Sequence, residues 1–179
     1  MKIIIQITDI SDTPVGELLE VRERGFLGDK LVIEGLTGMI VRSKQKSTNK
    51  QSDTPDQMME LFRLLIQTTD GQQLMFAEAS GDYNFIHTNM LLARLAGLPR
   101  TIMHDACVMA MGCNALVTHV LKNDTSRLTG ISGRFGKPTL PGDQLVLIGY
   151  ESHEPNEILF ELRNKSDQLV FKKGNFSYK

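Results

Sequence analysis

The sequence contains only two cysteines, Cys107 and Cys113, six positions apart. Both fall within one expected helix, where a rise of about 1.5 Å per residue places their Cα atoms about 9 Å apart. That separation is too large for a disulfide, and neither cysteine has the Cys or His spacing of a zinc site. We therefore expect two reduced residues of the core, in a protein from a reducing compartment.

The chain also lacks an excess of charge and a long apolar run. Its 20 basic and 21 acidic residues give a net charge of −1, which provides no reason to expect nucleic acid or an anionic membrane as a partner. No apolar run reaches the roughly 18 residues of a membrane span. Residues 1–7 are too short an apolar run for a signal peptide and lack a cleavage site. We expect a cytoplasmic protein that binds neither nucleic acid nor membrane.

The first 42 residues have patterns typical mainly of strands. Residues 1–8 are rich in isoleucine and alternate weakly, which favours an opening strand. Residues 17–24 fit a short helix or a strand equally well, and residues 25–30 have the chemistry of a turn. Residues 30–42 predict one or two strands, with a break at one of two internal glycines.

A polar segment and an ambiguous apolar segment follow. Residues 43–57 cannot bury much surface and are interpreted as a loop or linker. Residues 58–68 carry the i, i+3, i+4, i+7, i+8 apolar spacing of an amphipathic helix. A strand competes for the end of this segment, because residues 64–69 are apolar and β-branched.

Helical patterns occupy the middle of the chain. Residues 72–80 predict a helix that ends at Gly81 in a left-handed cap. Thr88 is expected to cap a second helix that continues to Leu95. Residues 101–122 form the longest pattern, and because its first half is apolar on nearly every side, we expect it to be buried on all sides.

After the long helix the periodicity changes to that of strands. Four candidate strands are separated by short turns, which is typical of an antiparallel sheet: residues 126–135, 143–151, 157–164 and 168–178. A buried helix followed by a sheet that must wrap it predicts an α+β protein with the hot-dog fold, a long central helix inside a curved antiparallel sheet.

A carboxylate and an imidazole lie close together in the sequence, just after the first of these helices. Asp82 precedes His87 by five residues, and the glycine, tyrosine and asparagine around them tolerate a turn. Taken singly, an Asp in a turn usually caps backbone N–H groups, and a His near a helix start is usually a surface residue. Together, the pair can transfer protons near neutral pH, because imidazole titrates there and a carboxylate can orient it or act as the base.

Three blocks of sequence resemble the MaoC-like family of (R)-specific enoyl-CoA hydratases and dehydratases. Residues 80–87, Ser-Gly-Asp-Tyr-Asn-Phe-Ile-His, resemble its Ser-Gly-Asp-x-Asn-Pro-Ile-His signature. Residues 98–104, Leu-Pro-Arg-Thr-Ile-Met-His, resemble the Gly/Phe-x-x-x-Ile-Ala-His-Gly block that opens its central helix. Residues 135–145, Phe-Gly-Lys-Pro-Thr-Leu-Pro-Gly-Asp-Gln-Leu, are similar to its Phe-x-x-Pro-x-x-Pro-Gly-Asp-x-Leu block. The order and spacing of the three blocks make the resemblance specific.

The resemblance implies a domain division and a dimer. We expect residues 71–179 to form a MaoC-like hot-dog domain and residues 1–70 to supply strands and a linker that complete or extend the fold. Families with this fold generally pair, so a homodimer is expected.

The resemblance also implies an activity in fatty acid metabolism. The protein is expected to be a lyase that hydrates trans-2-enoyl thioesters or dehydrates (R)-3-hydroxyacyl thioesters, with acyl-CoA or an acyl-carrier-protein thioester as its partner. Asp82 would activate water and His87 would share the proton transfer, with no cofactor and no metal. The residues expected to bind substrate are Asn84, His104, Asp105 and Ala106.

Two positions depart from the family pattern. Phe85 replaces the proline before Ile-His, and Asp105 replaces the glycine whose N–H helps hold the thioester oxygen. A carboxylate beside a developing oxyanion is electrostatically unfavourable. Two alternatives therefore stay open: an altered hot-dog protein that binds acyl thioesters without turnover, and a specialised dehydratase of lipid or polyketide assembly in which Asp105 is an added acid or base.

Overall fold

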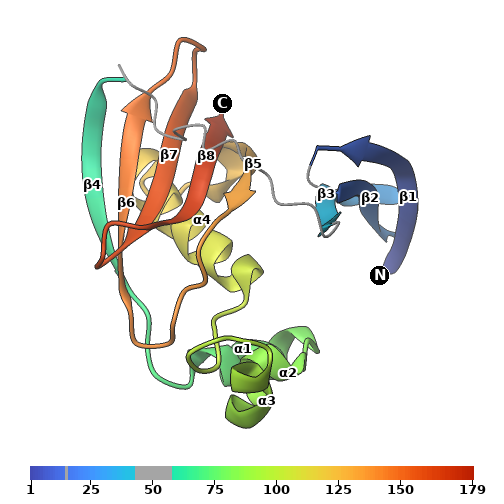
Figure 1. The fold of residues 1–179 in the computed structure, drawn as a ribbon. Coiled ribbons are helices and arrows are strands. Elements are labelled where there is room, and N and C mark those ends of the chain that lie inside the picture. Colours follow the sequence, from blue (N-terminus) through green and yellow to red (C-terminus); the bar gives the residue numbers. More distant parts are fainter. Residues whose placement is uncertain (15, 43–57) are drawn as a thin grey trace. The chain divides into compact units, whose positions relative to one another are not determined.

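The computed structural model describes residues 1–14, 16–42 and 58–179 (Figure 1). The chain divides into two compact units, Met1–Ser52 and Asp53–Lys179. The expected linker, residues 43–57, lies outside the described residues. In the described part of the chain, no helix is both long enough and apolar enough to cross a membrane.

The N-terminal unit is an antiparallel sheet of three long strands. Strands β1 (Lys2–Thr13), β2 (Gly16–Leu27) and β3 (Lys30–Arg42) pair in the order β1-β2-β3. The ambiguous residues 17–24 belong to β2, and β3 runs unbroken through both of its glycines. The turn is shorter than the predicted 25–30, since only residues 28–29 separate the two strands; Gly28 has φ +62°, a left-handed conformation that glycine adopts without a Cβ clash.

One face of this sheet is apolar. Residues directly opposite each other in an antiparallel pair share a face, and faces alternate along each strand. The register aligns Ile3 with Gly25 and Ile33, and Ile10 with Leu19 and Met39. The apolar face of the N-terminal sheet is defined by Ile3, Ile5, Ile7, Ile10, Leu19, Val21, Ile33, Met39 and Val41, and the register places Asp12, Glu17, Glu23 and Thr37 among them. Most of these side chains are exposed, whereas Val21 in the central strand is buried.

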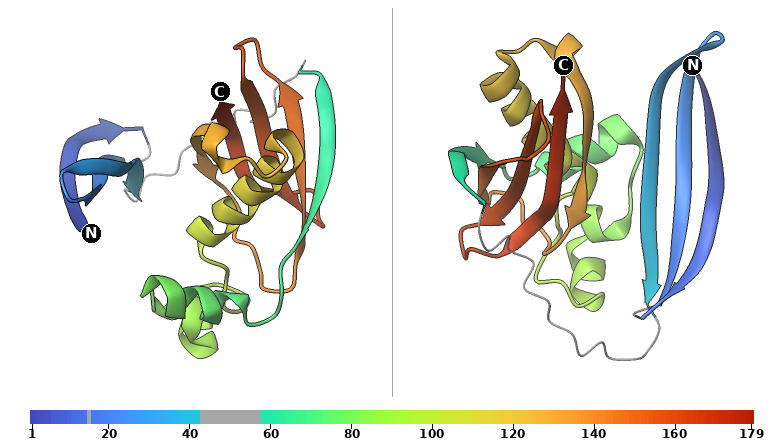
Figure 2. Two further views of the ribbon diagram at one scale, coloured as in Figure 1. Left: turned by 180° about the vertical axis from the view of Figure 1, so that it is seen from behind. Right: turned by 90° about the horizontal axis from the view of Figure 1, so that it is seen from above.

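The second unit contains a five-stranded antiparallel sheet with one long helix packed against it. Its strands are β4 (Glu60–Gln67), β5 (Leu128–Phe135), β6 (Gln144–Glu151), β7 (Glu157–Asn164) and β8 (Leu169–Tyr178), in the order β4-β6-β7-β8-β5. Helix α4 (Asp105–Leu121) lies across one face of the sheet (Figures 1 and 2). The four strands predicted after this helix are all present, and the α+β hot-dog arrangement is confirmed. Strand β5 pairs with β8 rather than with its sequence neighbour β6.

The prediction of a helix at residues 58–68 is wrong, because the edge strand β4 occupies this segment. Phe62, Leu64 and Ile66 turn toward the core with the period of two that a strand requires. Leu61 and Leu65, which contributed to the helical spacing, are exposed. Pairing with β6 gives this segment backbone hydrogen bonds along one edge, so the sheet decides the conformation that the local pattern left ambiguous.

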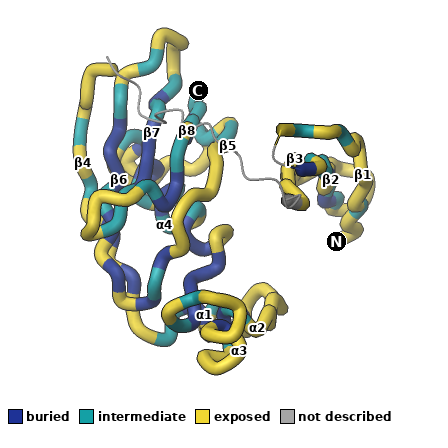
Figure 3. Tube along the Cα trace, viewed as in Figure 1, coloured by how far each residue is buried: buried dark blue, intermediate teal, exposed yellow. Residues whose placement is uncertain are grey.

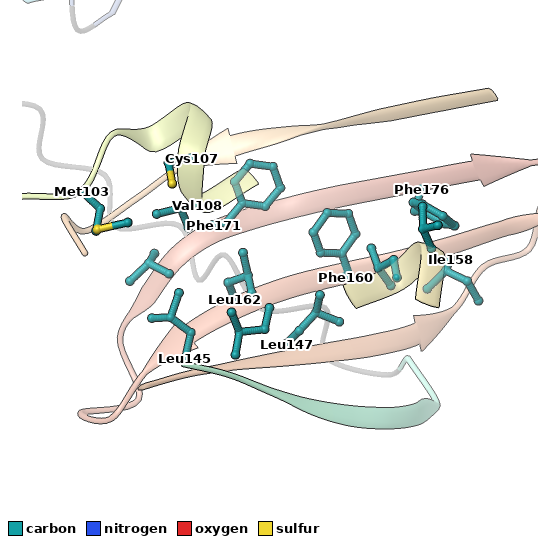
Figure 4. Close-up of a cluster of buried hydrophobic side chains, with 14 of the residues drawn as sticks. Met103, Cys107, Val108, Leu145, Leu147, Ile158, Phe160, Leu162, Phe171 and Phe176 are labelled. Carbon is teal, nitrogen blue, oxygen red and sulfur yellow. The ribbon is translucent and has the colours of Figure 1, made fainter. Parts of the chain in front are cut away.

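The core lies between α4 and the sheet (Figures 3 and 4). Cys107, Val108 and Leu116 from the helix pack with apolar residues of the sheet, among them Leu147 and Phe171. We expected α4 to be buried on all sides, and this prediction is wrong because one side of the helix is exposed. Its exposed side carries the row Ala106, Ala110, Asn114 and Thr118, so small apolar residues on this helix also face outward. Both cysteines are free thiols.

Three short helices lie beside the start of α4: α1 (Gln72–Ser80), α2 (Phe85–Thr88) and α3 (Met90–Leu95) (Figure 1). Helix α1 ends as predicted at Gly81, which has φ +78° and donates its N–H to the carbonyl of Ala77. The expected cap at Thr88 is wrong: Thr88 is the last residue of α2, and Asn89 caps α3 by accepting from the N–H of Leu92. The Asn89 side chain reaches the free donors of the first turn, whereas the Thr88 hydroxyl bonds back to the carbonyl of Asn84.

Candidate active site

Asp82 lies in the tight loop that joins α1 to α2. Its Oδ1 accepts a hydrogen bond from the N–H of Asn84 at 3.1 Å, and its own N–H donates to Ser80 Oγ at 3.2 Å. Asn84 in turn caps α2 by accepting from the N–H of Ile86. Local bonds between short polar side chains and the backbone therefore shape the loop. The side chain of Asp82 stays 54% exposed, so its carboxylate is accessible to a substrate.

His87 lies on α2 and is buried. Its Nδ1 is 3.0 Å from the carbonyl oxygen of Ile102. Because a carbonyl only accepts, Nδ1 carries the hydrogen, and Nε2 is the nitrogen left to exchange a proton. The backbone N–H of Ile102 also donates to the carbonyl of Ile86, so α2 is held against the segment that leads into α4.

His104 occupies the N-cap position of α4 and is 2% exposed. Its Nε2 is 3.0 Å from the carbonyl oxygen of Asp82 and 3.9 Å from Asp82 Oδ2. Its ring stacks on that of His87, with centroids 3.7 Å apart and planes inclined at 24°. Phe76 contacts the same ring, at 4.8 Å between centroids. His104 thus connects the two residues of the proposed proton-transfer pair.

Helix α4 begins next to this cluster. No side chain caps its first turn, which leaves backbone N–H groups available there together with the positive end of the helix dipole. Asp105 is its first residue, followed by Ala106, and both are exposed. This is the arrangement expected of a site that stabilises negative charge on a carbonyl oxygen.

Asp105 shares its electrostatic environment with both imidazoles. Although Asp105 is exposed on one side, protein atoms crowd its carboxyl, and this burial raises the pKa of Asp105. The charges of His87 and His104 act on the pKa of Asp105 in the opposite direction, and burial is the larger effect. The folded protein therefore favours the protonated carboxyl of Asp105 more than solvent does.

Asp82, His87 and His104 could by distance hold a metal ion. They are the candidate group among the residues that the structure describes, with one potential ligand atom from each within 4.8 Å of the others. However, a metal ion lies near the plane of each imidazole that binds it, at about 2.0–2.1 Å from nitrogen. Two rings stacked at 3.7 Å and only 24° from parallel cannot both meet that condition for one ion. The geometry suits proton transfer better than metal binding.

The structure brings together Asp82, His87, His104 and Asp105 from the sequence-predicted site. Asn84 orders the loop through its side chain, and Ala106 lies in the first turn of α4. Sequence reasoning missed Ile102, whose carbonyl fixes the His87 ring, and Phe76, which packs on His104. A backbone acceptor leaves no signal in the identity of a side chain. Phe76 lies inside the helical pattern of residues 72–80, and that pattern does not indicate a contact with His104.

Comparisons with known proteins define the family. Residues 46–167 match the MaoC like domain, which is more than half of the chain. The chain therefore belongs to the MaoC-like domain family. Among solved structures, the MaoC-like dehydratase from Phytophthora capsici superimposes with a TM-score of 0.84 at 23% identity, over 98% of this chain and 61% of that one.

Two curated relatives carry enzyme names. The chain is 37% identical over 78 residues to the peroxisomal enoyl-CoA hydratase 2 of Arabidopsis thaliana, a match covering 44% of this chain and 25% of the relative. It is 28% identical over 171 residues to 3-hydroxyacyl-thioester dehydratase Y of Mycobacterium tuberculosis, covering 89% and 58%. The chain thus spans well under two thirds of the length of these relatives.

Proposed function

We propose that this protein is a hydro-lyase that hydrates trans-2-enoyl thioesters or dehydrates (R)-3-hydroxyacyl thioesters. One observation carries the proposal: Asp82, His87 and His104 converge within 4.8 Å, beside the uncapped start of α4. The names of the two relatives, a hydratase and a dehydratase acting on acyl thioesters, support the same reaction class. The thioester would be carried by coenzyme A or by an acyl-carrier protein.

The reaction requires two proton transfers. In hydration, the oxygen of water bonds to C3 and the electrons of the double bond move toward the thioester oxygen. One proton leaves the water and one reaches C2, so the protein ends the turnover with unchanged charge. Hydration starts with Asp82 ionised and with a hydrogen on both nitrogens of His87. Asp82, which is accessible, takes a proton from water, and His87 gives its Nε2 proton to C2. The proton held by Asp82 then passes to Nε2 of His87, which restores the starting state. Dehydration uses the same groups in reverse.

In this proposal the thioester oxygen binds at the start of α4. Backbone N–H groups of Asp105 and Ala106 meet the negative charge that develops on it, since donors at an uncapped helix start need no rearrangement to do so. Asn84 and His104 complete the binding set by holding the loop that carries Asp82.

Hydration of crotonyl-CoA, followed by the loss of enoyl absorbance, tests the proposal. Asp82→Asn and His87→Ala should each lower kcat by about 10²-fold or more, the usual contribution of a positioned acid or base. His119→Ala is a matched control, because His119 lies near the other end of α4 and contacts Phe62 instead of the site residues. Full activity in both site variants, or no turnover of any enoyl or 3-hydroxyacyl thioester by the unmodified protein, contradicts the proposal.

The second candidate function is the binding of acyl thioesters without hydration. The observation that favours it is Asp105 in the position of the family glycine, at the start of α4. Asp105→Gly separates the possibilities. If the variant gains hydratase activity that the natural protein lacks, the protein has lost the catalytic function. If the variant loses an existing activity, Asp105 has acquired a role of its own, as in a specialised dehydratase.

We also propose that the protein forms a homodimer. The exposed apolar face of the N-terminal sheet supports this, because three strands with one apolar face gain stability only when that face is covered. Sedimentation of the full chain should give twice the monomer mass, and Ile5→Glu with Ile7→Glu should shift it toward the monomer. A monomer with unchanged fold contradicts the dimer. The cytoplasmic location stays a prediction of the sequence, since one relative is peroxisomal.

A further inference from the structure

We propose that His104 is a positioning residue. It fixes the positions of Asp82 and His87 relative to each other and does not itself exchange protons with the substrate. This inference rests on the proposed hydro-lyase function and assigns a role to the third residue of that site. It draws on three observations about the ring: what its Nε2 binds, what its face contacts, and what surrounds its Nδ1.

His104 ties down a loop that otherwise has only local bonds. The other hydrogen bonds of Asp82 within the described residues join it to Ser80 and Asn84, inside the same turn. Those bonds define the shape of the turn but do not determine where it lies relative to His87. The 3.0 Å bond from His104 Nε2 to the Asp82 carbonyl spans 22 residues and connects the loop to the start of α4. It is therefore the contact that places the carboxylate.

The same ring sets the position of the imidazole. His87 and His104 stack at 3.7 Å, and the Nδ1 of His87 is fixed by the carbonyl of Ile102, two residues before His104. One short segment, residues 102–104, thus holds His87 both by its edge and by its face. A displacement of this segment would move the carboxylate and the imidazole together, which keeps their separation constant.

His104 itself is badly placed for proton exchange. The residue is 2% exposed, and its Nδ1 is buried without a hydrogen-bond partner among the described residues. Its Nε2 hydrogen is engaged by the Asp82 carbonyl. A buried nitrogen without a partner is normally unfavourable, so the ring is retained here for its donor and its face, at some cost in stability.

This cost makes the role testable with His104→Phe. Phenylalanine keeps an aromatic face against His87, removes the buried unpaired nitrogen and removes the donor to Asp82. We expect the melting temperature to stay within about 3 °C of the unmodified protein or to rise. We expect kcat to fall about tenfold or more with KM nearly unchanged, because misplaced groups slow the chemical step without weakening substrate binding.

His104→Gln is the rescue variant and His119→Phe the matched control. Glutamine restores an N–H donor without the ring, so its kcat should lie between those of the phenylalanine variant and the unmodified protein. His119, on α4, also contacts an aromatic ring, that of Phe62 in β4, with ring centroids 4.4 Å apart and planes inclined at 49°. His119→Phe should therefore change neither kcat nor KM.

Backbone hydrogen exchange of residues 80–84 tests the positioning independently of turnover. The exchange should be faster in His104→Phe than in the unmodified protein and unchanged in His119→Phe. Unchanged exchange together with full activity in His104→Phe overturns the proposal, as does a glutamine variant no more active than the phenylalanine variant. If the unmodified protein turns over no thioester but the loop loosens as expected, the hydro-lyase assignment fails while the positioning contact stands.

Discussion

The imidazole rings of His87 and His104 stack face to face, with centroids 3.7 Å apart and planes at 24°. Each ring donates one hydrogen to a main-chain carbonyl, His87 to Ile102 and His104 to Asp82. The two histidines are therefore not equivalent. His87 keeps Nε2 for exchange, whereas the remaining nitrogen of His104 is buried. In the site that we propose, one imidazole is available for proton transfer and the second holds the carboxylate and the first ring in place.

The inward and outward faces of β4 predict opposite responses to truncation. Ile66 belongs to the core, whereas its neighbour Leu65 is 71% exposed. Ile66→Ala should lower the free energy of unfolding by about 2–4 kcal/mol, because it removes buried methyl groups and leaves a cavity. Leu65→Ala should cost about 0.5 kcal/mol or less. Urea unfolding of both variants checks this, and equal losses contradict the strand register of this segment.

Phe85→Pro, which restores the proline of the family signature, should be tolerated. Phe85 is the first residue of α2, where proline fits without loss of a helical hydrogen bond. The preceding Asn84 has φ −51° and ψ 132°, an extended conformation that is compatible with a following proline. We expect crotonyl-CoA hydration within about threefold of the unmodified rate, since fold and cap are both kept.

Ile86→Pro is the control for this substitution. It removes the N–H that Asn84 caps and disfavours a helical conformation at Phe85. We expect a loss of about 1–2 kcal/mol in stability together with reduced activity. If the two proline variants behave alike, the assignment of Phe85 to the first position of α2 is wrong.

The pKa of Asp105 predicts a pH-dependent change in stability. Because burial raises the pKa of Asp105 in the folded state, folding favours the protonated carboxyl. The ionised group therefore penalises the fold above that raised pKa, and the penalty vanishes as the pH falls below the ordinary carboxyl pKa of about 4. Asp105→Asn should raise the melting temperature at pH 7, and the gain should shrink steadily toward pH 4.

Thermal unfolding of the unmodified protein and of Asp105→Asn across this pH range measures the difference. Asp70→Asn is the control, because the Asp70 carboxyl is exposed. This variant should not gain melting temperature at pH 7 relative to pH 4. If the melting temperature gained by Asp105→Asn grows as the pH falls, the sign of the pKa shift is reversed and the prediction is wrong.

The sequence by itself determined most of the helix and strand content of residues 70–179, although it did not predict α2 or the cap of α3. The cap at Gly81, the long helix and all four following strands follow from local rules: glycine at a left-handed position, period-2 alternation and turn residues between strands. The chemical blocks also indicated the family that residues 46–167 match. These features depend on residues that are near each other in the chain, so the sequence is enough to predict them.

Tertiary structure alone decided the rest. The edge strand β4 forms because β6 offers a backbone to pair with, which overrides an equally good helical spacing. Strand β5 pairs with β8, the last strand in the chain, and not with β6, which follows it in sequence. Most of all, the role of His104 depends on a carbonyl and a ring face supplied by Asp82 and His87. Contacts between distant segments, especially those to backbone atoms, leave no pattern in the order of side chains, and only folding brings them together.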